Sequence, residues 1–151
     1  MLIKLLPSQV VQRDKNNEYI LWEAIKYAAT HVNSVDDKDL PKYLNELLHS
    51  LLNERSQCFV RIGDNREIVA IWITGFLMNT TNGEKYFQIK CVYGFKTSPD
   101  EIWKRDCEIL VQFAKKENCS YIGFQSRNKR IWDIGKLIGM TEAYRTFKLQ
   151  L

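Results

Sequence analysis

The chain has 151 residues, of which 45% are hydrophobic and 26% are charged, and its formal net charge is +4. A chain of this length forms one domain that buries roughly 70% of its unfolded surface, and so small a charge does not by itself indicate nucleic acid. Its longest apolar stretches are too short to span a membrane, and the opening apolar run is too short for the core of a signal peptide. We therefore predict one globular domain, residues 1–151, without linkers or repeats.

The first half of the chain predicts one strand, two helices and two further strands, in that order. An apolar run at residues 2–6 stops at a proline and is typical of a strand. Apolar residues at helical spacing predict helices at 17–31 and 39–54. The period then changes, which predicts strands at 58–62 and 67–78.

The second half continues with a hairpin. Asn82-Gly83 is a strong turn signal between two strands. The elements predicted after it are a strand at 85–93, a helix at 99–117, a strand at 120–125, a helix at 129–138 and a strand at 141–151. The resulting order, β-α-α-β-β-β-α-β-α-β, predicts an α+β protein whose central, mostly antiparallel sheet carries helices on both faces.

Ser98-Pro99-Asp100-Glu101 begins the helix predicted at 99–117. Serine at the cap, proline at the first helical position and glutamate at the third form a capping box, in which each side chain accepts a hydrogen bond from the other's backbone amide. The free amides at the start of a helix can bind a diphosphate. Here the two carboxylates in the first turn would repel it.

The four cysteines, Cys58, Cys91, Cys107 and Cys119, show no C-x-x-C spacing. Three of them fall within predicted strands or a predicted helix, as is typical of buried, reduced thiols. Because the chain has two histidines in all, the pattern does not favour a metal site. We expect free thiols, no metal and an intracellular location.

The element order resembles the GNAT superfamily of acetyl-CoA-dependent N-acetyltransferases over almost the whole chain. Asn128, Ile131, Ile134, Gly139 and Met140 fall at the spacing of a pattern that members carry after their fifth strand. The resemblance implies that coenzyme A would bind at the end of the fourth strand and at the start of the following helix. If acetyl-CoA binds, the expected contacts are the backbone of Val92 and Tyr93 and the side chains of Lys96 and Asn128.

Three departures from the family argue against acetyl transfer. No glycine lies between Phe95 and Phe113, where members have a glycine run that holds the pyrophosphate. The tyrosine that often acts as general acid corresponds to Gly135. Strict alternation along the fourth strand gives one face with Phe87, Ile89, Cys91 and Tyr93, and another with Tyr86, Gln88, Lys90 and Val92, neither of which has a carboxylate.

We therefore expect a degenerate GNAT domain that has lost acetyl-CoA chemistry, has no catalytic residues and no cofactor, and binds another protein or serves a structural role. Such domains occur in tailed phages, which implies a place in the cytoplasm or in a phage particle, with other virion or phage proteins as partners. Trp103, near the helix start, is a candidate to block the cleft between the fourth and fifth strands.

The alternative is a divergent N-acyltransferase, for which Tyr27 and His31 are acceptor-side candidates by analogy with the fold. A nucleic-acid site at the Arg127–Arg130 cluster is not favoured, because a solvated loop explains these charges. Cys91 and Cys107 are interpreted as buried apolar residues rather than nucleophiles, and His31 and His49 as helix-end and helix-surface residues.

Overall fold

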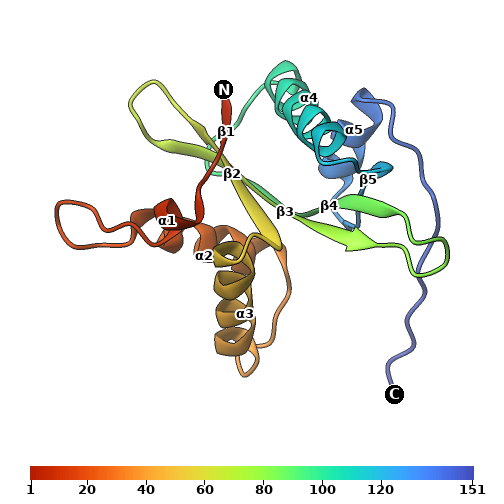
Figure 1. Ribbon diagram of the computed structural model, residues 1–151, viewed down its shortest axis with the longest axis horizontal. Helices are drawn as coiled ribbons and strands as arrows, with labels where there is room; N and C mark the ends of the chain where they lie inside the picture. Colours follow the sequence, from red (N-terminus) through yellow and green to blue (C-terminus); the bar gives the residue numbers. More distant parts are fainter.

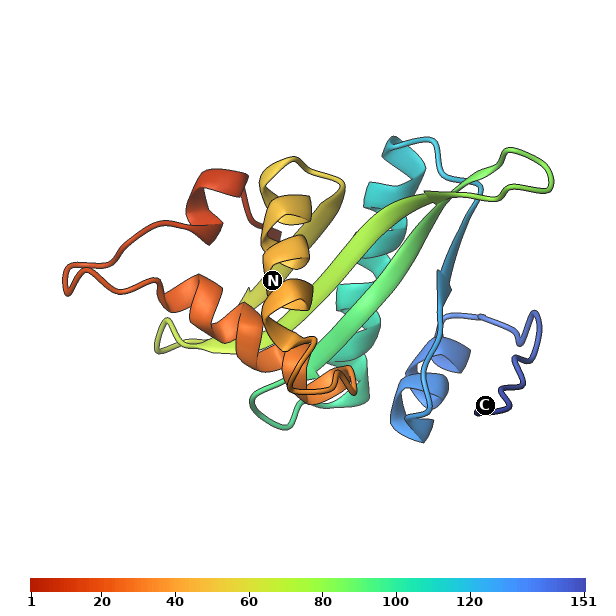
Figure 2. The same cartoon turned by 90° about the horizontal axis from the view of Figure 1, so that it is seen from below.

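Five strands form one sheet in the spatial order β1-β2-β3-β4-β5 in the computed structural model, which describes residues 1–151. The strands are β1 (Leu2–Lys4), β2 (Ser56–Ile62), β3 (Ile68–Met78), β4 (Lys85–Gly94) and β5 (Tyr121–Phe124). The helices are α1 (Pro7–Val10), α2 (Ile20–Val32), α3 (Leu40–Leu52), α4 (Asp100–Lys116) and α5 (Lys129–Leu137). Figures 1 and 2 show α2 and α3 on one face of the sheet and α4 and α5 on the other.

The sheet is mostly antiparallel, as predicted. Strands β1 to β4 pair antiparallel with their neighbours, and β5 pairs parallel with β4. The β3–β4 hairpin turns at the predicted position, where Gly83 has a φ of 72° that favours glycine. The crossover through α4 is what allows β5 to lie parallel beside β4.

Two hydrophobic cores lie on opposite faces of the sheet. Ile25 of α2 and Leu51 of α3 belong to the cluster on one face, together with Cys58 of β2. Trp103 and Leu110 of α4 belong to the cluster on the other face. The sheet therefore carries apolar side chains on both faces, which explains why the long central strands are hydrophobic with little alternation.

A β-bulge at Lys90 reverses the faces of β4. Ile73 of β3 pairs with Cys91 and the next residue pairs with Ile89, so Lys90 has no partner. Before the bulge, Phe87 and Ile89 belong to the core below α4, whereas Cys91 after it belongs to the core below α2 and α3. The strict alternation predicted for this strand is therefore wrong, because the extra residue shifts the pleat by one.

One short helix was not predicted from the sequence, and one predicted strand does not form. Residues 7–10 form a short helix that the proline at position 7 starts, since proline fits the first helical turn. Residues 141–151, predicted as a final strand, form no secondary structure and make no backbone hydrogen bond. A strand requires a partner, and the tail has none in this structure.

The four cysteines are free, and three of them are buried, as predicted. None of the helices is long and apolar enough to cross a bilayer.

Candidate functional site

Strands β4 and β5 separate at the place where the resemblance predicts a cofactor slot. Their pairing covers Tyr86 to Ile89 of β4 and ends at Phe124 of β5, whereas β4 continues to Gly94. The last five residues of β4 therefore have no strand on this side. The opening faces α4 and α5, which close it from one face of the sheet.

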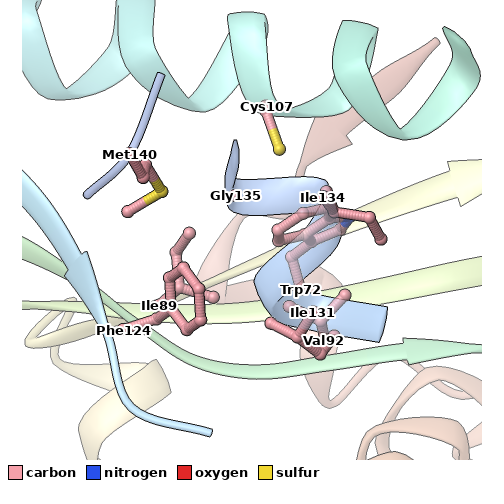
Figure 3. Close-up of a pocket in the computed structure, with 9 residues that line it drawn as sticks. All are labelled: Trp72, Ile89, Val92, Cys107, Phe124, Ile131, Ile134, Gly135 and Met140. Carbon is pink, nitrogen blue, oxygen red and sulfur yellow. The ribbon is translucent and has the colours of Figure 1, made fainter. Parts of the chain in front are cut away.

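Apolar side chains fill this opening. They leave a cavity of about 20 Å³, which is room for about one water molecule. Figure 3 shows side chains from β3, β4, β5 and α5 converging on this space. The lining residues are Trp72, Ile89, Val92, Cys107, Phe124, Ile131, Ile134, Gly135 and Met140. Pantetheine, which carries two amide groups, would find neither space nor a polar side chain here.

Gly135 allows this close packing. A Cβ at this position would lie 3.0 Å from Cε1 of Phe124 and 3.5 Å from the sulfur of Met140. The ring of Phe124 therefore lies against the backbone of α5, where any larger residue would push it away. The residue that corresponds to the family's tyrosine is a packing glycine in this chain.

Trp103 does not line the cavity; Trp72 does. Trp103 packs against Gly94 at the end of β4, and its ring centroid lies 5.8 Å from that of Trp72. The hypothesis that Trp103 blocks the cleft therefore names the wrong tryptophan. Sequence alone could not distinguish the two, because both are apolar residues facing the same core.

The start of α4 differs from the predicted capping box. The helix begins at Asp100, with Pro99 as its N-cap and no side-chain hydrogen bond to the cap. The Ser98 hydroxyl accepts a hydrogen bond from Nη1 of Arg61 at 2.8 Å instead. Because this donor is a charged guanidinium, its hydrogen bond to the Ser98 hydroxyl is stronger than one from a backbone amide of α4 would be.

The first turn of α4 is nevertheless acidic, with Asp100 and Glu101, as predicted. Arg130 in the first turn of α5 forms an ion pair with Asp100. This pair joins the two helix starts on one side of the β4–β5 opening. A diphosphate at the start of α4 would meet Glu101 and would have to displace Asp100 from Arg130.

Below this helix start lies a buried polar network that the sequence analysis missed. Nε of Arg61 donates to Oδ2 of Asp106 at 2.9 Å, and the indole N–H of Trp72 donates to the same oxygen at 3.3 Å. Arg61 and Asp106 are 7% and 2% exposed. Burial raises the pKa of Asp106, although the guanidinium of Arg61 opposes this shift. The available signals were an arginine within an apolar strand and an aspartate within the apolar stripe of a helix.

An aromatic cluster lies on the other face, where α2 crosses the end of β4. The rings of Tyr27 and His31 stack with centroids 3.8 Å apart, and those of Tyr93 and Phe95 meet edge to face at 5.0 Å. The Tyr27 and Tyr93 rings are 5.7 Å apart, and the interaction with Tyr27 raises the pKa of Tyr93. The structure thus brings both acceptor-side candidates, Tyr27 and His31, to the end of β4.

His31 is held in a defined tautomer. Its Nδ1 lies 2.7 Å from the backbone oxygen of Tyr27. Because a carbonyl oxygen accepts but never donates, Nδ1 carries the proton, and Nε2 of the neutral ring keeps a free electron pair. His31 is an exposed residue of α2.

The four residues expected to contact acetyl-CoA do not converge. Val92 lines the small cavity, whereas Tyr93 belongs to the aromatic cluster on the opposite face. The ammonium of Lys96 pairs with Glu67 at 2.6 Å and lowers the pKa of that carboxyl group. Asn128 caps α5, because its side-chain oxygen accepts the backbone N–H of Arg130 at 2.9 Å.

Comparison with known proteins finds similarity in structure but not in sequence, since no family model matches and no curated protein matches. A probable acetyltransferase superposes with a TM-score of 0.71 at 9% identity, covering 100% of this chain and 97% of that one. The aminoglycoside antibiotic 6'-N-acetyltransferase of Acinetobacter baumannii gives 0.68 at 11% identity, with coverage of 100% and 97%. A GNAT family acetyltransferase of Staphylococcus aureus gives 0.62 at 16% identity, with coverage of 99% and 98%.

These likenesses span nearly the full length of the chain and, with the observed sheet order, they show an α+β fold shared with acetyltransferases. The fold is that of the GNAT acetyltransferases, as the sequence resemblance predicted. At such low identities the likeness concerns the fold, and the activity is a separate question.

Proposed function

We propose that this protein uses the GNAT fold as a protein-binding or structural module and does not perform acetyl-CoA chemistry. The observation that carries this proposal is the closed β4–β5 opening, whose remaining cavity is about 20 Å³. Three features support it: the acidic start of α4, the packing role of Gly135, and a fourth strand without a carboxylate.

Opening the slot would require several buried groups to move together. Phe124 and Ile134 would leave their contacts at the cavity, and the Arg130–Asp100 pair would break to admit a diphosphate. Well-packed interiors resist such changes, because each displaced side chain loses its contacts before any ligand replaces them. The closed packing therefore favours a cofactor-free protein.

The partner we propose is another protein, and the resemblance to degenerate phage domains makes a virion or phage protein the first candidate. Release of coenzyme A from acetyl-CoA in the presence of mixed amines tests the loss of chemistry, and we expect no release above the buffer rate. Mass spectrometry of purified phage particles from the source of this chain tests the proposed location. Amine-dependent release would overturn the proposal.

One observation favours the alternative, a divergent N-acyltransferase. The ring of His31, whose Nδ1 is hydrogen-bonded to the backbone and whose Nε2 is left free, lies beside the rings of Tyr27 and Tyr93 at the end of β4. In this alternative His31 accepts a proton from an amine that attacks a thioester, a role that needs no carboxylate on β4. The assay is the release of coenzyme A from acetyl-CoA. The alternative would be established if His31→Ala abolished this release while His49→Ala, a matched change at another exposed histidine, left it intact.

A further inference from the structure

Residues 143–151, which we call the tail strand, alternate between two rows of side chains. One row is Ala143, Arg145, Phe147, Leu149 and Leu151, and the other is Tyr144, Thr146, Lys148 and Gln150. A period of two with apolar residues in one row is typical of a strand that buries one face. In this structure the row is uncovered, since Phe147 and Leu149 are 89% and 84% exposed.

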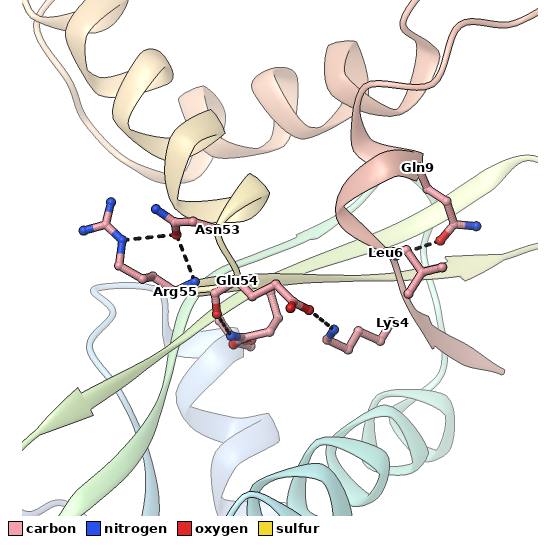
Figure 4. Close-up of polar contacts among 8 residues, drawn as sticks. Lys4, Leu6, Gln9, Asn53, Glu54 and Arg55 are labelled. Carbon is pink, nitrogen blue, oxygen red and sulfur yellow. Dashed lines mark hydrogen bonds and ion pairs between the residues drawn. The ribbon is translucent and has the colours of Figure 1, made fainter.

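Strand β5 has an unprotected free edge. It is the last strand of the sheet, and its four residues, Tyr121 to Phe124, include neither a charge nor a proline. Apart from the ladder with β4, these residues make no backbone hydrogen bond. The opposite edge is protected differently: β1 has three residues and carries Lys4, which pairs with Glu54 (Figure 4). Open edges without such protection accept a further strand.

The tail strand does not occupy the β5 edge of its own molecule. Its one bond to this region joins Nε2 of Gln125 to the hydroxyl oxygen of Tyr144 at 2.7 Å. Beyond Tyr144 the chain leads away, and Figure 1 shows the C-terminus far from β5. Each molecule therefore carries one open sheet edge and one segment that can form a strand. In a two-fold dimer, the segment of each copy can pair with the open edge of the other.

We propose that the tail strand pairs with the free edge of β5 in a second copy of this chain. This inference rests on the proposed function, because it names one partner of the binding module. The pairing supplies backbone partners to both strands and covers the apolar row of the tail.

The two faces of β5 determine which row of the tail strand is buried. Ile122 and Phe124 pack against the core below α4, whereas Tyr121 stacks on Tyr86 on the other face. The row with Phe147 therefore lies beside Ile122 and Phe124 and extends that core. A slip by one residue would replace Phe147, Leu149 and Leu151 in the apolar layer with the polar residues Thr146, Lys148 and Gln150, so the pairing favours one row over the other.

Light scattering after gel filtration tests the proposal with two adjacent substitutions, Phe147→Asp and Thr146→Asp. We expect the wild-type chain and Thr146→Asp to be dimers, and Phe147→Asp to weaken dimerisation at least tenfold. A monomeric wild-type chain at about 100 μM, or equal effects of the two substitutions, would overturn the proposal.

Disulfide trapping then distinguishes exchange from pairing within one molecule. Ile122→Cys and Phe147→Cys are made as separate variants, each on a Cys119→Ser background, because Cys119 is the one native thiol that is not buried. Mixing them under oxidation gives a covalent heterodimer if the strands exchange. If a chain with both cysteines gives cross-linked monomer instead, the tail pairs with its own β5 and the proposal is wrong. Neither result bears on acetyl-CoA binding, so a failure here leaves the proposed function testable by itself.

Discussion

Replacing Asp106 with alanine removes the one carboxylate that balances a buried guanidinium. Arg61 would keep the Ser98 hydroxyl as an acceptor and the face of Trp103 at 4.8 Å, but no negative charge. Nη2 of Arg61 already has no hydrogen-bond partner, so the site has no spare acceptor to compensate. The indole N–H of Trp72 would lose its partner as well.

Breaking a buried ion pair by removing one member costs about 3–5 kcal/mol. We expect Asp106→Ala to lower the free energy of unfolding by this amount, which is a large part of the stability of a domain of this size. In a chain of 151 residues this corresponds to a loss of roughly 10 °C in Tm. Urea unfolding followed by tryptophan fluorescence measures the change directly.

The double substitution Arg61→Met with Asp106→Leu is the matched control. It removes both charges and leaves apolar residues of similar size, so we expect it to cost less than Asp106→Ala alone. The reasoning would be refuted if Asp106→Ala cost less than about 1 kcal/mol, or if the double variant cost as much as the sum of the two single ones.

The pH dependence of the Arg61→Met variant follows from the same site. Burial raises the pKa of Asp106 above its ordinary value of 3.8, and removing Arg61 removes the main group that opposes this shift, leaving the indole N–H of Trp72 and the N-terminal ammonium. The folded state then binds the proton more tightly than the unfolded state, so stability rises as pH falls from 7 toward 4 and is lost as pH rises. Urea midpoints across this range that fall with decreasing pH would contradict the account.

Three further predictions follow from the packing. Gly135→Ala places a Cβ 3.0 Å from the Phe124 ring and should destabilise the fold by about 1–3 kcal/mol in thermal unfolding; an unchanged Tm would show that the ring moves freely. Trp103→Ala should cost about 3–5 kcal/mol without creating acetyl-CoA binding, because Trp103 does not line the cavity. Burial raises the pKa of Cys91 and of Cys107 to about 12 from 9.0, so the unfolded chain releases these protons first as pH rises above 9. Stability should therefore fall by about 1.4 kcal/mol per pH unit for each thiol. Burial raises the pKa of Cys58 as well, so Cys107→Ala should remove about a third of this part of the slope; a slope that this substitution leaves unchanged would refute the assignment.

Much of the fold was predictable because its elements carry local signals. The helices at Ile20–Val32 and Leu40–Leu52 have apolar stripes, and the β3–β4 hairpin carries Asn82-Gly83 at its turn. These signals place every strand of the sheet and every long helix to within a few residues. Because the element order fits the GNAT fold, the resemblance extended these local signals to the correct sheet and to helices on both faces.

The site was less predictable, because it depends on contacts between residues far apart in the chain. The Ser98 hydroxyl bonds to Arg61, which is 37 residues away, rather than to its own helix. The bulge at Lys90 exists only in the pairing of β4 with β3, and a single strand's sequence does not reveal it. Whether the β4–β5 opening is filled depends on how Phe124 and Ile134 pack, which no local pattern encodes.

The central claim is that the β4–β5 opening does not accept coenzyme A. Calorimetric titration of the purified protein with acetyl-CoA tests it, with the desulfo and dephospho analogues as controls. We predict no heat of binding at about 1 mM ligand, because the filled cavity and the acidic start of α4 exclude both the pantetheine arm and the diphosphate. Saturable binding at micromolar concentrations, weakened in the dephospho analogue, would contradict the claim and make the divergent acyltransferase the better account.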